Sequence, residues 1–159
     1  MQSKEIVLTF ERMSEADIPE LAVVMKRAFD DDAQKYLGQP EGGPDGYDNG
    51  DFFRKWVFGD AGGVGWKILA DGKIAGSFIV WILSDGNNIL GNIFVDPSMQ
   101  DFGIGTRTWE FIEATYPDSV SWQLDTPTWA KKNHHFYEKL GFVREKVEGE
   151  DVHYKKMMK

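Results

Sequence analysis

The sequence predicts an α/β fold in which a mixed sheet of about seven strands has helices on both faces. Segments with alternating apolar residues are interspersed with segments whose apolar residues recur at helical spacing. Strands joined by tight turns lead into one strand–helix–strand crossover, which requires a parallel pair. The chain has 159 residues and is 42% apolar, so we expect one domain, residues 1–159, with a sizeable core.

The first third of the chain predicts one strand, two helices and a loop. Residues 5–13 alternate partly and are expected to form the first strand. A capping box beginning at Ser14 and the apolar spacing after it predict a helix over residues 15–29. Residues 38–50 are rich in glycine, proline and aspartate, which predicts an exposed loop, and residues 51–58 are expected to form a short helix.

The rest of the chain predicts hairpins and then the crossover. Asp71-Gly72 is typical of a hairpin turn within residues 65–83, and a further strand is expected over residues 87–97. A glycine turn follows, and then a helix that Pro117 ends. The remaining predicted elements are a strand over residues 119–127, a helix over 129–141 and two final strands over 142–149 and 150–159.

The composition limits the functional classes. The chain has no cysteine, which excludes disulfides, a thiol nucleophile and a thiolate metal site. No apolar run reaches ~18 residues and the N-terminus does not resemble a signal peptide, so we expect a cytoplasmic protein without a membrane span. The formal net charge of −8 is expected to repel nucleic acid and anionic membranes over most of the surface.

A glycine turn, QDFGIG, lies between a predicted strand and a predicted helix. Gly103 and Gly105 permit positive φ angles and the close approach of a ligand, and the first turn of a helix offers unpaired N–H groups to a phosphate. No Gly-Lys-Ser/Thr follows, so the turn is not a Walker loop, and Thr108 stands where a dinucleotide fingerprint has its third glycine. By itself such a motif is more often a plain tight turn than a phosphate site.

A second motif, YEKLGF, runs from Tyr137 to Phe142 at the end of a predicted helix. Taken alone, Tyr137 fits a core position better than a catalytic one. Together, the two motifs resemble the GNAT superfamily of acetyl-CoA-dependent N-acyltransferases, whose loop pattern is Gln/Arg-x-x-Gly-x-Gly/Ala and whose later helix typically ends Tyr-Glu-Lys-Leu-Gly-Phe. The predicted order of elements agrees over most of the chain, although the first third agrees only in pattern.

The resemblance implies the GNAT acyl-CoA N-acyltransferase fold and acetyl-CoA (coenzyme A) as cosubstrate. Backbone N–H groups from Phe102 to Thr106 would hold the pyrophosphate, and the strand edge at Phe94 and Val95 would pair with the pantetheine arm. One position departs from the family pattern, because many members have asparagine where this chain has Ala130. The cofactor-binding residues that the resemblance implies are Phe94, Val95, Gln100, Asp101, Phe102, Gly103, Ile104, Gly105, Thr106, Asn133 and Tyr137.

The resemblance also implies two catalytic groups. The N–H of Val95 would stabilise the oxyanion of the tetrahedral intermediate, and Tyr137 would protonate the departing thiolate. No motif fixes the base that removes the proton of the amine. Asp125, at the end of the strand after the crossover, is the catalytic candidate for that role. The alternatives are a capping role for Asp125, a water chain, or an amine that is already neutral.

The histidines do not predict a metal site. His134 and His135 are adjacent in a predicted helix and therefore point about 100° apart, and His153 lies far along the chain. The first two are expected at the surface, in helix packing, or beside Tyr137. Trp129 is either a core residue or a border of the acceptor site.

The sequence therefore predicts an N-acetyltransferase that moves an acetyl group from acetyl-CoA to a primary amine of a small molecule or peptide by direct attack. The alternatives are a catalytically inactive CoA-binding domain that acts as a sensor or interaction module, and a nucleotide-binding protein that uses the glycine turn differently. The second lacks the further glycine-rich or acidic ribose signature that it requires.

An acidic segment, residues 30–51, bears on the acceptor. It holds seven acids and one basic residue, Lys35. In the GNAT family this region borders the acceptor site, so the segment is either a rim that attracts a cationic amine or a solvated loop. No nucleic acid, metal or membrane partner is expected, and a homodimer is left open.

Overall fold

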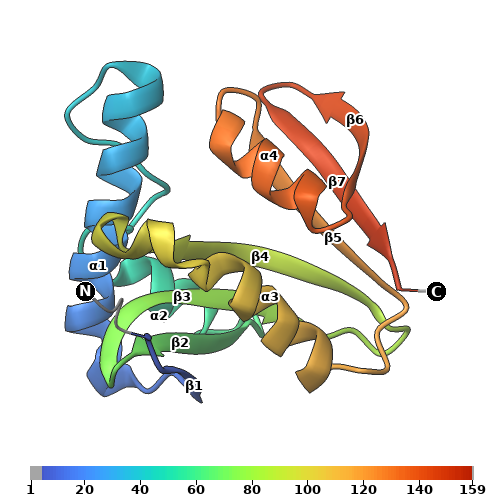
Figure 1. Ribbon diagram of the computed structural model, residues 1–159, viewed down its shortest axis with the longest axis horizontal. Helices are drawn as coiled ribbons and strands as arrows, with labels where there is room; N and C mark the ends of the chain where they lie inside the picture. Colours follow the sequence, from blue (N-terminus) through green and yellow to red (C-terminus); the bar gives the residue numbers. More distant parts are fainter. Residues whose placement is uncertain (1–4, 159) are drawn as a thin grey trace.

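The protein, seen in a computed structural model that describes residues 5–158 except for the side chain of Asp101, contains one seven-stranded sheet (Figure 1). The strand order is β1-β2-β3-β4-β5-β7-β6, and the predicted mixed sheet is confirmed. The strands are β1 (Leu8–Arg12), β2 (Val64–Ala70), β3 (Lys73–Trp81), β4 (Asn87–Val95), β5 (Ser121–Pro127), β6 (Val143–Glu148) and β7 (Asp151–Met157).

The helices follow the predicted order, with short helical segments added. The additions are a 3₁₀ turn within the predicted first helix, an extension of that helix, and a turn before the glycine motif. None of the helices within the described residues is long and apolar enough to cross a membrane. The helical segments are η1 (Glu15–Asp17), α1 (Ile18–Asp32), η2 (Ala33–Leu37), α2 (Asp51–Trp56), η3 (Pro97–Phe102), α3 (Ile104–Thr115) and α4 (Lys131–Lys139).

The first helical region begins at the predicted capping box. The Ser14 N–H donates to the Asp17 carboxylate at 2.8 Å, and the box is complete in both directions. At the other end η2 carries the helix to Gly38, whose φ of 65° is the left-handed conformation that ends many helices. The helix therefore runs past the predicted end at residue 29, because the acidic residues that follow lack apolar periodicity but still propagate the helix.

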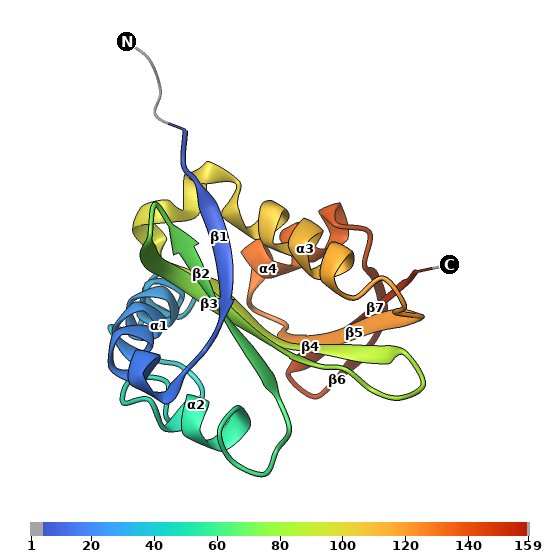
Figure 2. The same cartoon turned by 90° about the horizontal axis from the view of Figure 1, so that it is seen from below.

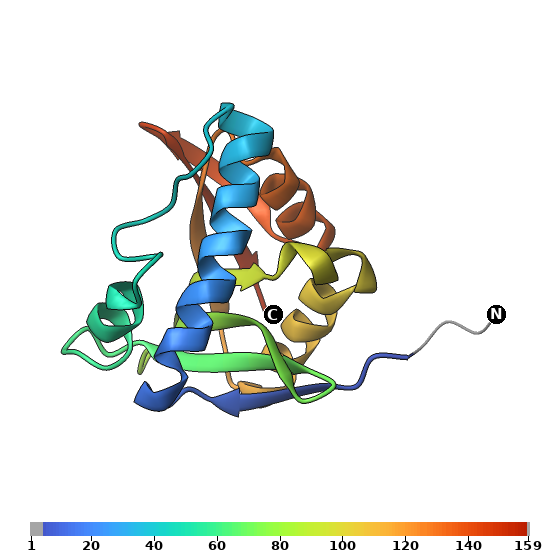
Figure 3. The same ribbon diagram turned by 90° about the vertical axis from the view of Figure 1, so that its left-hand side faces the viewer.

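The sheet is covered on both faces, as predicted. Figures 2 and 3 show α1 and α2 on one face and α3 and α4 on the other. Alternate residues of β3 therefore enter different cores: Phe78 and Val80 pack in the cluster with α3 and α4, and Ile79 packs in the cluster with α1 and α2. Burial on both faces explains why residues 75–80 form an unbroken buried run.

The parallel pair β4–β5 holds together only at its beginning. Its register contains three pairs, Asn87 with Ser121, Asn88 with Trp122 and Ile89 with Gln123. Beyond them β4 continues to Val95 without a partner on that side, and β5 continues to Pro127 while paired only with β7. The two halves of the sheet thus diverge toward the carboxyl ends of β4 and β5 (Figure 1).

Candidate active site

A cleft of about 310 Å³ occupies the region where β4 and β5 diverge. Residues from both faces of the sheet line it, because α1 contributes from one face and α3 and α4 from the other. The lining residues are Ala28, Phe29, Asp32, Ile93, Phe94, Val95, Gln100, Gly103, Gly105, Thr106, Lys132, Asn133, Phe136, Tyr137 and Lys139. The cleft therefore joins the glycine turn, the end of β4 and the helix that carries Tyr137, which are far apart in the sequence.

The glycine turn places the amino end of α3 at this cleft. Gly103, with φ of 69°, ends η3 and is also the N-cap of α3. The N–H groups of Ile104, Gly105 and Thr106 lie in the first turn, where a helix supplies no carbonyl partner and carries a partial positive charge. This arrangement suits an anionic phosphate.

Two members of the predicted phosphate loop lie just before that turn. Phe102 is the last residue of η3, and half of its surface is exposed. Asp101 also lies within η3, but its side chain is outside the described part of the structure. The N–H groups at the amino end of α3 are therefore those of residues 104–106, a narrower set than the predicted 102–106.

The second glycine of the motif also allows close packing. A Cβ atom placed on Gly105 would lie 2.9 Å from two ring atoms of Phe136, a residue of α4. At Gly103, by contrast, an added Cβ would have no atom within 4 Å. The motif therefore has one position that brings α3 close to α4 and one that opens on the cleft.

The Val95 N–H points toward the gap between β4 and β5. Peptide groups along a strand alternate in direction, and the next N–H, that of Asp96, donates to the Ala75 carbonyl in β3 at 2.6 Å. The N–H and C=O of Val95 therefore point away from β3. In agreement with this, the Val95 carbonyl accepts a hydrogen bond from Gln100 Nε2 at 3.4 Å, and both residues line the cleft.

Phe94 contributes its backbone and its ring differently. Its side chain is 6% exposed and packs with the rings of Phe29 and Phe53 in the core between the sheet and α1. The ring therefore closes the cleft on the α1 face. By the same alternation the N–H and C=O of Phe94 point toward β3, so its predicted pairing with the pantetheine arm stays a prediction.

Tyr137 combines a core position with a place in the cleft. The residue is 7% exposed, and its ring lies 5.8 Å from that of Phe142 and 6.2 Å from that of Tyr154. Within residues 5–158 its hydroxyl has no hydrogen-bond partner, and burial raises the pKa of Tyr137 well above its usual range. The hydroxyl therefore stays protonated at physiological pH and is available as a donor.

Asn133 lines the same cleft one turn of α4 before Tyr137. Its Nδ2 donates to Thr126 Oγ1 at 3.3 Å, which ties α4 to the end of β5. The structure thus brings Asn133 to the cleft, and its predicted contact with the cofactor stays a prediction.

Asp125 does not line the cleft. Leu124 and Thr126 are buried while Asp125 is exposed, so alternation along β5 directs its side chain to the other face of the strand. Its carboxylate pairs with His153 Nδ1 at 2.8 Å on the neighbouring strand β7, not with the turn before α4. The assignment of Asp125 as the base stays a prediction.

The other two histidines do not form a metal site. Within the described residues no group of three histidine, aspartate or glutamate side chains could hold a metal ion. His134 Nε2 donates to the Pro127 carbonyl at 2.7 Å and its Nδ1 accepts from Arg144 at 3.0 Å, which fixes one neutral tautomer. His134 therefore links α4 to the end of β5 and to the beginning of β6.

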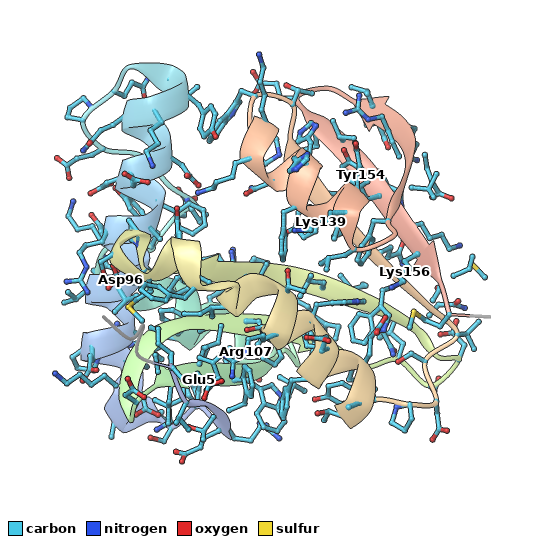
Figure 4. The ribbon with its side chains drawn as sticks, in the orientation of Figure 1. Glu5, Asp96, Arg107, Lys139, Tyr154 and Lys156 are labelled. Atoms are coloured by element: carbon cyan, nitrogen blue, oxygen red, sulfur yellow. The ribbon has the colours of Figure 1, made fainter. Side chains whose placement is uncertain are left out.

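Asp96 fastens the end of β4 to α1 (Figure 4). Its carboxylate accepts from Arg27 at 2.6 Å and from the N–H and hydroxyl of Ser98 at 3.1 and 3.0 Å. Burial alone would raise the pKa of Asp96, but the hydrogen bonds from Arg27 and Ser98 together outweigh it and lower the pKa. Asp96 therefore positions η3, and with it the glycine turn, relative to α1.

Asp96→Asn is expected to lower the free energy of unfolding by about 1–2 kcal/mol at pH 7, because the charge-assisted bond to Arg27 is lost. A carboxyl whose pKa is lowered by folding stabilises the protein above its unfolded pKa of about 3.9 and loses that contribution as pH falls through the folded pKa. Urea unfolding should therefore show a smaller difference between wild type and variant near pH 3 than at pH 7. Asp60→Asn, at an exposed position, is the control, and a pH-independent difference for Asp96→Asn would contradict the assignment.

Several cleft residues were not predicted as functional. They include Asp32 on α1 and Lys132, Phe136 and Lys139 on α4. Helical spacing offered a signal for α4, since residues 132, 136 and 139 share a face with the predicted Asn133 beside them. No spacing relates Asp32 to these residues, because only the tertiary fold brings α1 to α4.

Comparison with known proteins identifies a family and a relative of the chain. Residues 61–144 match the family model described as an acetyltransferase (GNAT) domain. The chain is 38% identical over 134 residues to the uncharacterized protein YrkN of Bacillus subtilis, covering 83% of this chain and 71% of that protein.

Solved structures show the same fold. An acetyltransferase from Thermus thermophilus superimposes with a TM-score of 0.79 at 14% identity, covering 95% of this chain and 97% of that one. The PaiA N-acetyltransferase of Thermoplasma acidophilum, solved in complex with coenzyme A, gives a TM-score of 0.75 at 16% identity, with 95% and 99% covered.

Proposed function

The chain belongs to the GNAT acetyltransferase family, and from this membership and the cleft we propose that it transfers the acetyl group of acetyl-CoA to a primary amine of a small molecule or peptide by direct attack. The observation that carries the proposal is the meeting of three groups at one cleft. These are the N–H groups at the amino end of α3, the Val95 N–H on the open edge of β4, and the Tyr137 hydroxyl on α4.

The described residues suit the parts of acetyl-CoA. The N–H groups of residues 104–106 would hold the pyrophosphate. The unpaired edge of β4 would pair with the amides of the pantetheine arm, as an added strand does. Acetyl-CoA supplies the acetyl group as a thioester, and the divergence of β4 and β5 leaves a passage between the two faces of the sheet in which this thioester would lie.

The residues of the chain would then act on the transfer in two places. As the amine nitrogen bonds to the carbonyl carbon, the Val95 N–H donates to the oxygen that gains negative charge. As the carbon–sulfur bond breaks, the Tyr137 hydroxyl donates its proton to the sulfur. The attacking amine releases a proton to water, and Tyr137 then takes up a proton from that water. No nucleophile of the protein is required.

Thiol release from acetyl-CoA in the presence of a panel of primary amines tests this function. We expect amine-dependent release with N-acetylated amine as the product, identified by mass spectrometry. Tertiary amines of similar size are the control, because they cannot form a neutral amide. CoA binding without amine-dependent release would contradict the proposal and favour a CoA-binding sensor or interaction domain.

A further inference from the structure

An ammonium group of the protein itself bridges the cleft. Lys132 on α4 places its Nζ 2.9 Å from Asp32 Oδ1 on α1 and 3.3 Å from Gln100 Oε1. All three residues line the cleft, and Gln100 is in turn bonded to the Val95 carbonyl. The bridge therefore joins the two sides of the cleft next to the residue whose N–H points into the gap.

Ion pairs neutralise most of the acids of the acidic segment, residues 30–51. Lysines and arginines from outside the segment, as well as Lys35 within it, pair with most of its acids. Within the described residues, Asp45 and Asp48 have no ion pair, and both are exposed. The pairs are Asp30 and Glu41 with Lys26, Asp31 with Lys35, Asp32 with Lys132, and Asp51 with Arg54.

Asp32 is the one acid of this segment that lines the cleft within the described residues. Its side chain is 18% exposed, so its charge is less screened than those of the solvated acids of the loop. Lys132 is more exposed, at 39%, and its flexible side chain can leave the carboxylate without unfolding α4. The acceptor oxygens of Asp32 and Gln100 would then remain at the cleft.

We propose that Asp32 and Gln100 form a binding site for an ammonium group of the acceptor, and that Lys132 occupies this site when no acceptor is bound. The proposal rests on the proposed function and specifies its substrate class. A carboxylate at close range favours the charged form of an amine, whereas the attacking nitrogen must be neutral. The nitrogen held by Asp32 is therefore not the one acetylated. The acceptor would be a primary amine with a second cationic group, such as a diamine.

Calorimetry with matched amines tests this proposal without requiring turnover. The probes are 1,3-diaminopropane, 1,4-diaminobutane and 1,5-diaminopentane, each compared with the monoamine of the same chain length. Wild type should bind at least one diamine more tightly than its monoamine. Asp32→Asn should weaken the binding of that diamine by about tenfold and remove the preference for the diamine over the monoamine. An effect of this size is typical of one hydrogen bond between charged groups.

Lys132→Met distinguishes a lysine that competes with the acceptor from one that only holds α1 to α4. If Lys132 competes with the acceptor, removing its ammonium should strengthen diamine binding severalfold while monoamine binding changes little. If the bridge only held α1 to α4, then Asp32→Asn and Lys132→Met would change binding in the same direction. The controls are Lys139→Met, a lysine of the same helix that also lines the cleft, and Asp48→Asn, an exposed acid of the same segment; neither should alter the preference.

The outcomes separate this proposal from the acetyl transfer itself. Equal affinity of wild type for diamines and monoamines, a preference that survives Asp32→Asn, or weaker diamine binding by Lys132→Met would each overturn the ammonium site. Thiol release with monoamines would still support acetyl transfer in those cases. Conversely, diamine binding that depends on Asp32 without any thiol release would support the ammonium site and contradict the transferase function.

Discussion

Tyr137→Phe is expected to lower kcat for acetyl transfer by roughly 10²–10⁴, with the affinity for acetyl-CoA little changed. The substitution keeps the ring that packs between α4 and the sheet and removes only the hydroxyl. Because that hydroxyl has no hydrogen-bond partner within residues 5–158, its loss leaves no buried group newly unpaired. The loss of activity would therefore report on the chemical step and not on stability.

The matched control is Tyr116→Phe. Tyr116 also lies against the main core, and its hydroxyl accepts from Trp66 Nε1 at 3.1 Å, outside the cleft. Steady-state rates and burst kinetics should show a defect in the Tyr137 variant alone. Unchanged kcat in Tyr137→Phe, in an enzyme whose chemical step is rate-limiting, would make Tyr137 a packing residue only.

The second large effect is expected for Gly103→Glu, which should weaken acetyl-CoA binding by about a hundredfold or more. An added Cβ at this position meets no atom within 4 Å, and Gly103 lines the cleft beside the amino end of α3. A carboxylate there would face the pyrophosphate, and close contact between like charges costs several kcal/mol. Calorimetry with CoA measures the loss.

The left-handed backbone at Gly103 requires a control for strain. Gly149, in the turn between β6 and β7, has a similar φ of 59° and equally open surroundings. Glutamate at either position should cost about 1–2 kcal/mol of stability through the same strain. Gly149→Glu should bind CoA like wild type. If both variants bind CoA with equal affinity, the pyrophosphate does not bind at the amino end of α3. Gly105→Glu is a poorer test, because the new side chain would also collide with Phe136.

The sequence predicted the order of strands and helices because the local signals are strong. The Ser14 capping box, the Asp71-Gly72 turn and the alternation along β5 all appear in the structure. The resemblance to the GNAT family implies the divergence of β4 and β5, but no residue pattern shows it, because it depends on which residues stop pairing. The same apolar run predicts a strand whether its edge is paired or open.

The site was predictable where its residues lie in one local motif. The glycine turn and Tyr137 reach the same cleft because each is fixed by the end of a helix or strand. The Asp32–Lys132 bridge joins residues that are 100 positions apart, so no pattern in the sequence relates them. For the same reason the sequence does not reveal that Lys26, Arg54 and Lys132, which lie outside the acidic segment, pair with acids of the segment in space.

A crystal structure of the protein with CoA tests the central claim most directly, namely that the gap between β4 and β5 holds the acetyl donor. The account predicts the pyrophosphate against the N–H groups of residues 104–106 and the sulfur between the Val95 N–H and the Tyr137 hydroxyl. CoA bound outside this cleft, or with its sulfur remote from both Val95 and Tyr137, would contradict the account.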